Sequence, residues 1–155
     1  MGTVIAAYSD SERRALSAYT KLMRAAESIT GRTSRILAAS NLTVSQFGIL
    51  EVLFHKGPLC QRELAAKILK STGNITMVID NLVKQNLVRR ARDHDDRRFI
   101  TIHLTESGQL LIEKVFPSIM VAIVKEMSIL KEGEQDELAK LCRLIGLQEE
   151  KGIAC

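Results

Sequence analysis

The sequence predicts a mostly α-helical protein with a small two- to three-stranded β wing. Three observations lead to this fold class. Apolar residues recur at helical spacing over most of the chain, two short runs alternate apolar and polar residues, and a charged segment separates those runs. The 155 residues are 46% hydrophobic and 26% charged, which is the composition of a globular protein with its own core. We therefore expect one domain over residues 1–155.

An amphipathic helix is predicted for residues 9–30. Ser9 and, three residues later, Glu12 form a capping-box pattern at its start, and apolar residues then recur at spacings of three and four. Gly31 is expected to end this helix, and a separate short helix is expected over residues 35–39. The N-terminal segment should therefore present one long apolar stripe.

Two further helices are predicted for the next part of the chain. The first begins after Thr43 and stops at Gly57, which is followed by proline. Leu59 then supplies a strand-like residue or two, and a second helix covers about residues 61–69. Both helices carry apolar residues on one face, so we expect them to pack on a common core.

A third helix is expected to begin at Ser71 or Thr72. Its inward face consists of apolar residues at helical spacing: Ile75, Val78, Ile79 and Leu82. Asn86 is expected to end this helix, because asparagine tolerates the left-handed conformation that a C-terminal cap requires.

A β-hairpin is predicted after the third helix, with strands over residues 87–91 and 99–104. Apolar and polar residues alternate in the second run, which is typical of a half-buried strand. The segment 92–98 between the strands is charged and forms the tip. A helix, a tight turn, a second helix and a hairpin in this order are the pattern of a winged helix-turn-helix, here over residues 40–104.

This pattern favours DNA binding. The outward face of the third helix is small or polar near its amino end, as a helix that enters a major groove requires, and the free N–H groups of its first turn can bind a phosphate. Residues 59–104 carry 9 Lys/Arg against 5 Asp/Glu, whereas residues 105–155 carry 6 against 9. The basic middle of the chain suits a polyanionic partner.

Several motifs in this region resemble the MarR family of bacterial transcription regulators. They are Leu64-Ala65-Ala66-Lys67-Ile68-Leu69, Thr76 with Val78-Ile79-Asp80-Asn81-Leu82, Leu87-Val88-Arg89-Arg90, Asp96-Arg97-Arg98 and Leu104-Thr105-Glu106-Ser107-Gly108. The run Gly73-Asn74-Ile75-Thr76, with Pro117, is most similar to the branch that senses quinones and phenolic compounds. The resemblance implies an obligate homodimer on a pseudo-palindromic double-stranded DNA operator, usually as a repressor.

The resemblance also implies which residues contact DNA. On the recognition helix they are Ser71, Thr72, Asn74, Thr76 and Met77. In the wing they are Arg97 and Arg98, with Arg98 entering the minor groove and Asp96 orienting it. Asp80 is expected either to pair with a wing arginine and so orient the wing, or to be solvated. The sequence departs from the family pattern at Asn86, where glycine is usual, and at Cys60, where a threonine helix cap is common.

The two flanking regions, residues 9–30 and 105–147, are predicted to be dimerisation helices. Residues 111–127 are apolar over more than half of a helix circumference, which is more than a lone domain of this size can cover. Pro117 should kink this helix because it removes an N–H from the helix interior. A last helix is expected over about residues 134–145. Burial inside the monomer is the alternative explanation for these apolar faces.

The sequence leaves the control mechanism open. The family resemblance implies a pocket for a small aromatic or phenolic ligand near Tyr19, Met23, Phe47 and His55. The competing hypothesis is a thiol-based redox regulator that senses through Cys60, at the start of a helix. A winged-helix protein-interaction adaptor without DNA affinity is a third hypothesis.

No cofactor, metal site or enzymatic activity is expected. The sequence has no Cys-x-x-Cys spacing, no glycine-rich phosphate loop and no nucleophile-elbow motif, and His94 among the aspartates of the tip is interpreted as a solvated wing residue. The longest apolar stretch, residues 115–124, is too short for a bilayer, which needs about 20 residues, so no membrane span is expected. Three scattered cysteines do not form a disulfide framework, and we expect a cytoplasmic protein.

Overall fold

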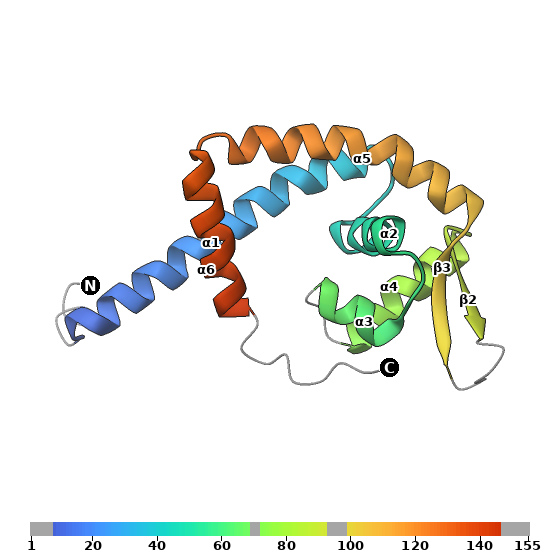
Figure 1. Cartoon of the computed structure of the whole chain (residues 1–155), viewed down its shortest axis with the longest axis horizontal. Helices are drawn as coiled ribbons and strands as arrows, with labels where there is room; N and C mark the ends of the chain where they lie inside the picture. Colours follow the sequence, from blue (N-terminus) through green and yellow to red (C-terminus); the bar gives the residue numbers. More distant parts are fainter. Residues whose placement is uncertain (1–7, 69–71, 93–98, 147–155) are drawn as a thin grey trace.

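The computed structural model describes residues 8–68, 72–92 and 99–146 of the chain. Within these ranges the elements are α1 (Asp10–Ala38), α2 (Val44–Lys56), β1 (Leu59–Cys60), α3 (Gln61–Lys67), α4 (Thr72–Lys84), β2 (Val88–Arg92), β3 (Ile100–Leu104), α5 (Glu106–Met127) and α6 (Glu132–Gly146). The predicted mostly α fold with a small β wing is confirmed. Figure 1 shows a lobe beneath α5 that consists of α2, α3, α4 and the sheet. Helix α1 extends away from this lobe, and α6 crosses α1.

Helix α1 is a single 29-residue helix, and the predicted end at Gly31 and the separate helix over 35–39 are wrong. The predicted capping box is present, because the N–H of Ser9 donates to the Glu12 carboxylate at 2.7 Å and the N–H of Glu12 donates to the Ser9 hydroxyl at 3.3 Å. A glycine inside a helix costs only about 1 kcal/mol relative to alanine. Burial of Leu37, which is 0% exposed near the end of α1, offsets that cost.

The core of the lobe is formed where α2, α3, α4, α5 and the sheet meet. Its most deeply buried side chains all have less than 2% exposure: Leu37, Ile49, Leu50, Leu64, Ile75, Ile79, Leu82, Val88, Ile102, Ile112 and Ile119. Thr43 caps α2 as predicted, and Gly57, with a φ of 78°, ends it. The turn after α2 leads directly into β1, so the helices and the sheet share one core.

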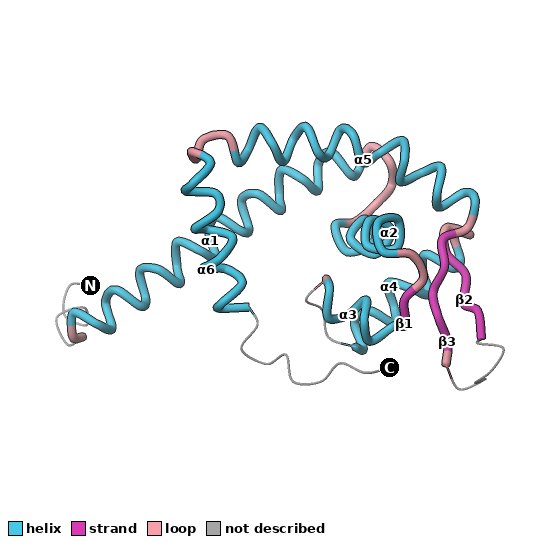
Figure 2. The backbone as a smooth tube through the Cα atoms, in the orientation of Figure 1, coloured by secondary structure: helices cyan, strands magenta, loops and turns pink. Residues whose placement is uncertain are grey.

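The sheet has the strand order β1-β3-β2, and both pairs are antiparallel (Figure 2). Val88 pairs with Leu104 and Arg90 with Ile102, and these residues share the face that packs on the core. Arg89 pairs with His103 on the opposite face. The register therefore points alternate arginines of β2 to the two sides of the wing.

Asn86 ends α4 as predicted. Its φ is 56°, in the left-handed region, and its N–H donates to the carbonyl of Val83 at 2.9 Å. The N–H of Leu87 donates to the carbonyl of Leu82 at 2.9 Å, which completes a two-bond C-terminal cap. Asparagine therefore replaces glycine at this position without loss of the cap.

Helix α5 runs through Pro117 as one element of 22 residues. The sequence predicts no membrane span, but α5 is long and apolar enough to cross a bilayer by length and composition alone, since an 18-residue window of it has a mean hydropathy of 1.4. The expectation counted only the uninterrupted apolar run. A core helix of a soluble protein meets the same criteria, and Ile112, Val115 and Ile119 of α5 are buried in the lobe.

None of the residues of helix α6 is buried. It crosses α1 part-way along that helix, on the side of the molecule away from the sheet (Figure 1). Several large apolar side chains of α6 are exposed, among them Leu144 at 64% and Ile145 at 57%. The apolar residues of α6 therefore lack the cover that the core gives to α2, α3 and α4.

Candidate nucleic-acid interface

The burial of α4 determines which of its residues face outward. Ile75, Ile79 and Leu82 are fully buried, so the helix is anchored by one apolar face. On the other side Asn74 is exposed and Met77 has 60% of its surface exposed. Of the remaining predicted contact residues, Ser71 and the side chain of Thr72 lie outside the part of the chain that the structure describes.

Thr76 is hydrogen-bonded to the preceding helix. The side-chain amide of Gln61, the first residue of α3, donates to the hydroxyl of Thr76 on α4. This contact links the two helices of the helix-turn-helix. Sequence reasoning assigned Thr76 to DNA and missed Gln61. The signal available was a long polar side chain at the first position of α3, which the sequence alone could not connect to α4.

The base of the wing is joined to α4 by an ion pair. The guanidinium of Arg90 on β2 donates to the Asp80 carboxylate at 2.6 Å. The partner of Asp80 is therefore an arginine of the wing strand. The predicted wing residues Asp96, Arg97 and Arg98 lie outside the described residues.

The outer face of the wing carries Arg89 and His103 opposite each other. Partial burial, and to a smaller extent the nearby charge of Arg89, lower the pKa of His103 below its usual value. Its Nε2 lies 2.9 Å from the hydroxyl of Thr101. The lowered pKa disfavours the charged form of His103, and the exposed arginines in the described part of the wing are Arg89, Arg90 and Arg92.

Cys60 occupies the N-cap position of α3. Its backbone is extended, with φ −75° and ψ 163°, and its N–H donates to the Glu63 carboxylate at 2.9 Å. This contact from Glu63 is one of the two hydrogen bonds of a capping box, and it does not require a threonine at position 60. Cys60 is 8% exposed and disulfide-bonded, whereas Cys142 is a free, exposed cysteine.

The described residues contain no group of three or more His, Cys, Asp or Glu side chains arranged to hold a metal ion.

The four predicted ligand-pocket residues occupy different places. Phe47 is 9% exposed and belongs to the lobe core. His55 stacks edge-on against Phe116 of α5 at a centroid distance of 5.0 Å. Tyr19, 63% exposed, lines a cavity of about 540 Å³ between α1 and α6, and Met23 is half exposed on α1. Of the four, this cavity is lined by Tyr19 alone.

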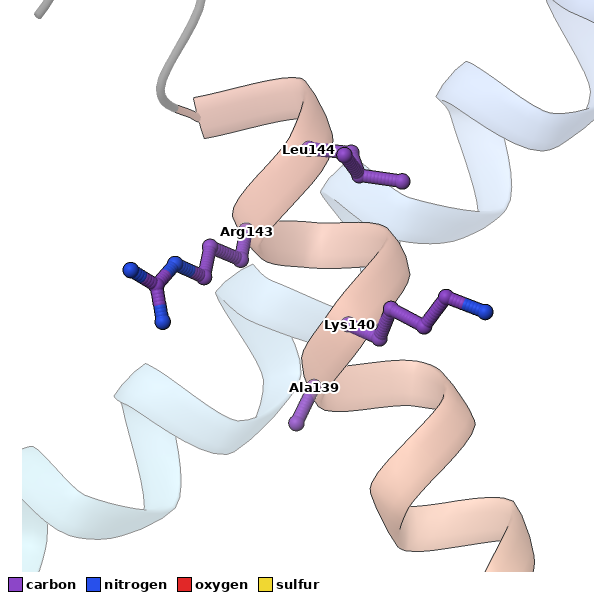
Figure 3. Close-up of a pocket in the computed structure, with 4 residues that line it drawn as sticks. All are labelled: Ala139, Lys140, Arg143 and Leu144. Carbon is purple, nitrogen blue, oxygen red and sulfur yellow. The ribbon is translucent and has the colours of Figure 1, made fainter.

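The cavity between α1 and α6 is almost entirely apolar. Its lining residues are Ala15, Ala18, Tyr19, Lys21, Leu22 and Ala25 of α1 and Leu138, Leu141, Cys142 and Ile145 of α6. Another cavity, of about 490 Å³, lies along α6 next to Ala139, Lys140, Arg143 and Leu144. Figure 3 shows Arg143 and Lys140 pointing to opposite sides of the helix. Helix α6 is therefore exposed on more than one side.

Comparison with protein families decides the identity of the chain. Residues 33–115 match the family model described as transcriptional regulator SarA/Rot. The HTH-type transcriptional regulator MhqR of Bacillus subtilis is 31% identical over 134 residues, which are 86% of this chain and 92% of that protein. The chain belongs to the MarR/SarA-Rot family of helix-turn-helix transcriptional regulators. It is a DNA-binding regulator and not an enzyme.

Solved structures show the same fold. Sco3205, a MarR family regulator from Streptomyces coelicolor solved in complex with DNA, matches with a TM-score of 0.82 at 19% identity, covering 94% of this chain and 92% of that one. BpsR of Bordetella bronchiseptica, whose DNA binding is regulated by 6-hydroxynicotinic acid, matches with a TM-score of 0.74 at 22% identity, covering 83% of this chain and 98% of that one. The MarR fold thus extends over the described helices on both sides of the lobe.

Proposed function

We propose that this MarR-family protein is a homodimeric cytoplasmic repressor that binds a pseudo-palindromic operator and is released by a small aromatic ligand. In each protomer α4 enters a major groove, with Asn74 and Met77 facing the bases, and the wing follows the adjacent minor groove. Arg97 and Arg98 are the wing residues proposed to contact DNA, oriented by Asp96. Ser71, Thr72 and Thr76 complete the proposed contacts of the recognition helix.

The main support for a dimer is the exposed apolar surface of α1, α5 and α6. Its exposed members include Leu16, Tyr19, Met23, Met120, Val121, Ile123, Val124, Leu138, Leu141, Leu144 and Ile145. Soluble monomers rarely expose so many large apolar side chains on adjoining helices. A second copy of the chain would cover them and remove this surface from water.

The charges on these helices also suit a second copy. Arg13, Arg14, Lys21 and Arg24 are exposed on α1, and Glu132, Glu134, Asp136 and Glu137 are exposed on α6. Charges of opposite sign around an apolar centre favour the correct partner and the correct register. Packing α1 and α6 of one protomer against those of the other would bring these two sets together.

The dimer is tested with Ile123→Glu. Ile123, which is 44% exposed, lies one helical turn beyond the buried Ile119 of α5, and in the dimer a glutamate there would be an unpaired buried charge. We expect a monomer in light scattering and loss of tight operator binding. Ser118→Glu adds the same charge on an exposed, polar position of the same helix and should leave the dimer intact. A monomeric Ile123→Glu protein with wild-type operator affinity would contradict the proposal.

Two aromatic environments support the ligand class. His55 and Phe54 contact each other at a centroid distance of 5.0 Å, and both lie near Phe116 where α2 meets α5. Tyr19 faces the apolar cavity next to α6. The structural neighbour BpsR is regulated by an aromatic hydroxy acid. An aromatic ligand held near Tyr19, Met23, Phe47 or His55 would act by changing how the dimer helices hold the two lobes.

The competing mechanism is redox control through Cys60. The observation that favours it is that Cys60 is in a disulfide, which a reductant would open to the thiol. DNA release is measured for the wild type and Cys60→Ser with 4-hydroxybenzoate, which is not an electrophile, and separately with dithiothreitol and with peroxide. Release of both proteins by the phenolic acid alone supports the ligand mechanism. If the wild type alone responds, and only to the reductant or oxidant, thiol control replaces it.

A further inference from the structure

The start of α5 is hydrogen-bonded to the turn that ends the recognition helix. Thr105, the N-cap residue of α5, donates from its hydroxyl to the carbonyl oxygen of Asn86 at 2.6 Å. Its N–H donates to the carbonyl oxygen of Leu87 at 3.1 Å, and the same hydroxyl accepts from the N–H of Gly108 at 3.0 Å. One threonine therefore joins two segments that lie 19 residues apart in the sequence.

The turn on the other side of this joint is tied to the recognition helix itself. Asn86 and Leu87 donate their N–H groups to the carbonyls of Val83 and Leu82 in the last turn of α4. Leu82 is fully buried in the lobe core, so this end of α4 is held firmly. A continuous path of hydrogen bonds thus runs from the last turn of α4, through Thr105, to the first turn of α5.

Gly108 allows the two segments to approach closely enough for these bonds. A Cβ at this position would lie 1.9 Å from the carbonyl oxygen of Leu87 and 3.2 Å from a methyl group of Leu104. The backbone of α5 therefore packs directly on the turn, and only glycine fits there. The close packing and the hydrogen bonds therefore hold the same contact, between the first turn of α5 and the turn that ends α4.

We propose that Thr105 is a positioning residue for operator binding. It holds α4 at a set angle to α5, and through α5 it sets the separation of the two recognition helices in the dimer. It does not contact DNA. The inference rests on the proposed function, since it requires a two-fold operator. Two recognition helices in successive major grooves must be about 34–36 Å apart, so a looser angle weakens the preference for one half-site spacing.

The test uses Thr105→Asp. Aspartate still accepts the N–H bond that caps α5, but its carboxylate cannot donate to the carbonyl of Asn86. Dissociation constants are measured for the best operator that the protein selects from genomic DNA, for that operator with one base pair inserted between its half-sites, and for one half-site alone. We expect the preference for the correct spacing to fall by about fivefold or more, a typical coupling between sites, with the wild-type preference retained by Thr105→Ser.

Thr43→Asp is the matched control. Thr43 is the N-cap residue of α2, where its hydroxyl accepts the N–H of Gln46 at 3.1 Å, so the substitution makes the same change of charge at the same kind of position. It should leave the spacing preference unchanged. If Thr105→Asp does not fold, Thr105→Val, which lacks the hydroxyl, provides the comparison.

The outcomes separate this inference from the proposed function. Equal spacing profiles for Thr105→Asp, Thr43→Asp and the wild type would overturn the role of Thr105. A wild-type protein that is monomeric, or that binds both spacings equally, would instead overturn the two-fold operator model. Loss of spacing preference in Thr105→Asp, with wild-type affinity for the single half-site after correction by Thr43→Asp, is the result expected.

Discussion

Asp80 is a carboxylate on α4, the helix that we expect to enter a major groove, and it forms an ion pair with Arg90 of the wing. The side chains of Asp80 and Arg90 are 46% and 35% exposed, so water screens their interaction. Exposed pairs of this kind contribute about 0.2–1 kcal/mol to the free energy of unfolding. Asp80→Asn keeps the size of the side chain, and the protein should therefore remain folded with at most a small loss of stability.

The effect of Asp80→Asn on DNA binding should be larger than its effect on stability. The substitution removes a charge that repels phosphates and frees Arg90 to bind one. Each phosphate contact adds about 0.9 to the steepness with which the logarithm of the binding constant falls with the logarithm of salt concentration. We expect tighter binding to random DNA at low salt and a slope steeper by about 1. The contact between the wing and α4 would also weaken, because the amide oxygen of asparagine accepts from Arg90 without the charge, so discrimination in favour of the operator should fall.

Fluorescence anisotropy measures both effects, with a random duplex and an operator duplex of equal length titrated between about 50 and 200 mM salt. Glu113→Gln, on α5 and outside both the candidate interface and the charges assigned to the dimer, makes the same change of charge at an exposed position and is the control. An unchanged slope with unchanged discrimination, or the same change in both variants, would refute the role assigned to the ion pair.

Four further predictions concern the wing, the recognition helix, the pH dependence and the first helix. Arg98→Ala should weaken operator binding by about 1–3 kcal/mol in a mobility-shift titration, and normal affinity of the folded variant would remove the wing tip from the mechanism. The double variant Asn74→Ala/Thr76→Ala should bind operator and random DNA with similar affinity, because base contacts provide sequence preference; an unchanged ratio would mean that α4 is not the reading helix. The pKa of His103 is lowered in the folded protein, so the unfolded state takes up the proton first, and the resulting loss of stability should begin as the pH falls below about 6.5; His103→Gln should flatten that part of the unfolding profile, and an unchanged profile would contradict this. Gly31→Ala should raise the free energy of unfolding by about 0.5–1 kcal/mol in a denaturant titration, since a Cβ there meets nothing within 4 Å; a destabilised variant would show that the helix does not pass freely through this position.

Most of the secondary structure could be predicted because it depends on local signals. Capping residues such as Ser9 and Thr43 satisfy the free N–H groups of the next turn, and their spacing to Glu12 and Gln46 is visible in the sequence. Asn86 was predicted to end α4 for the same reason, since the left-handed conformation is a property of a single residue. The alternation in β3 indicated its buried face because successive strand residues point to opposite sides.

The continuity of α1 could not be predicted in this way. Gly31 is a local signal against helix, but its cost of about 1 kcal/mol is small beside the burial of a large apolar side chain such as Leu37. That burial depends on α2 and α5, which are distant in the sequence. Where a local preference is weak, packing with distant segments decides the outcome.

For the candidate site, the residue types could be predicted from local patterns: a helix with a small or polar outward face, a basic hairpin and apolar flanking helices that indicate a dimer. The hydrogen-bond and ion-pair partners of these residues depend on the folded arrangement. It selected Arg90 for Asp80, connected Gln61 to Thr76 and brought Thr105 to the carbonyl of Asn86. Side-chain hydrogen bonds act over about 3 Å, whereas neighbouring positions in the sequence only limit how far apart residues can be. Which side chains come within that distance depends on how α3, α4, α5 and the sheet pack together, and this packing results from the whole core.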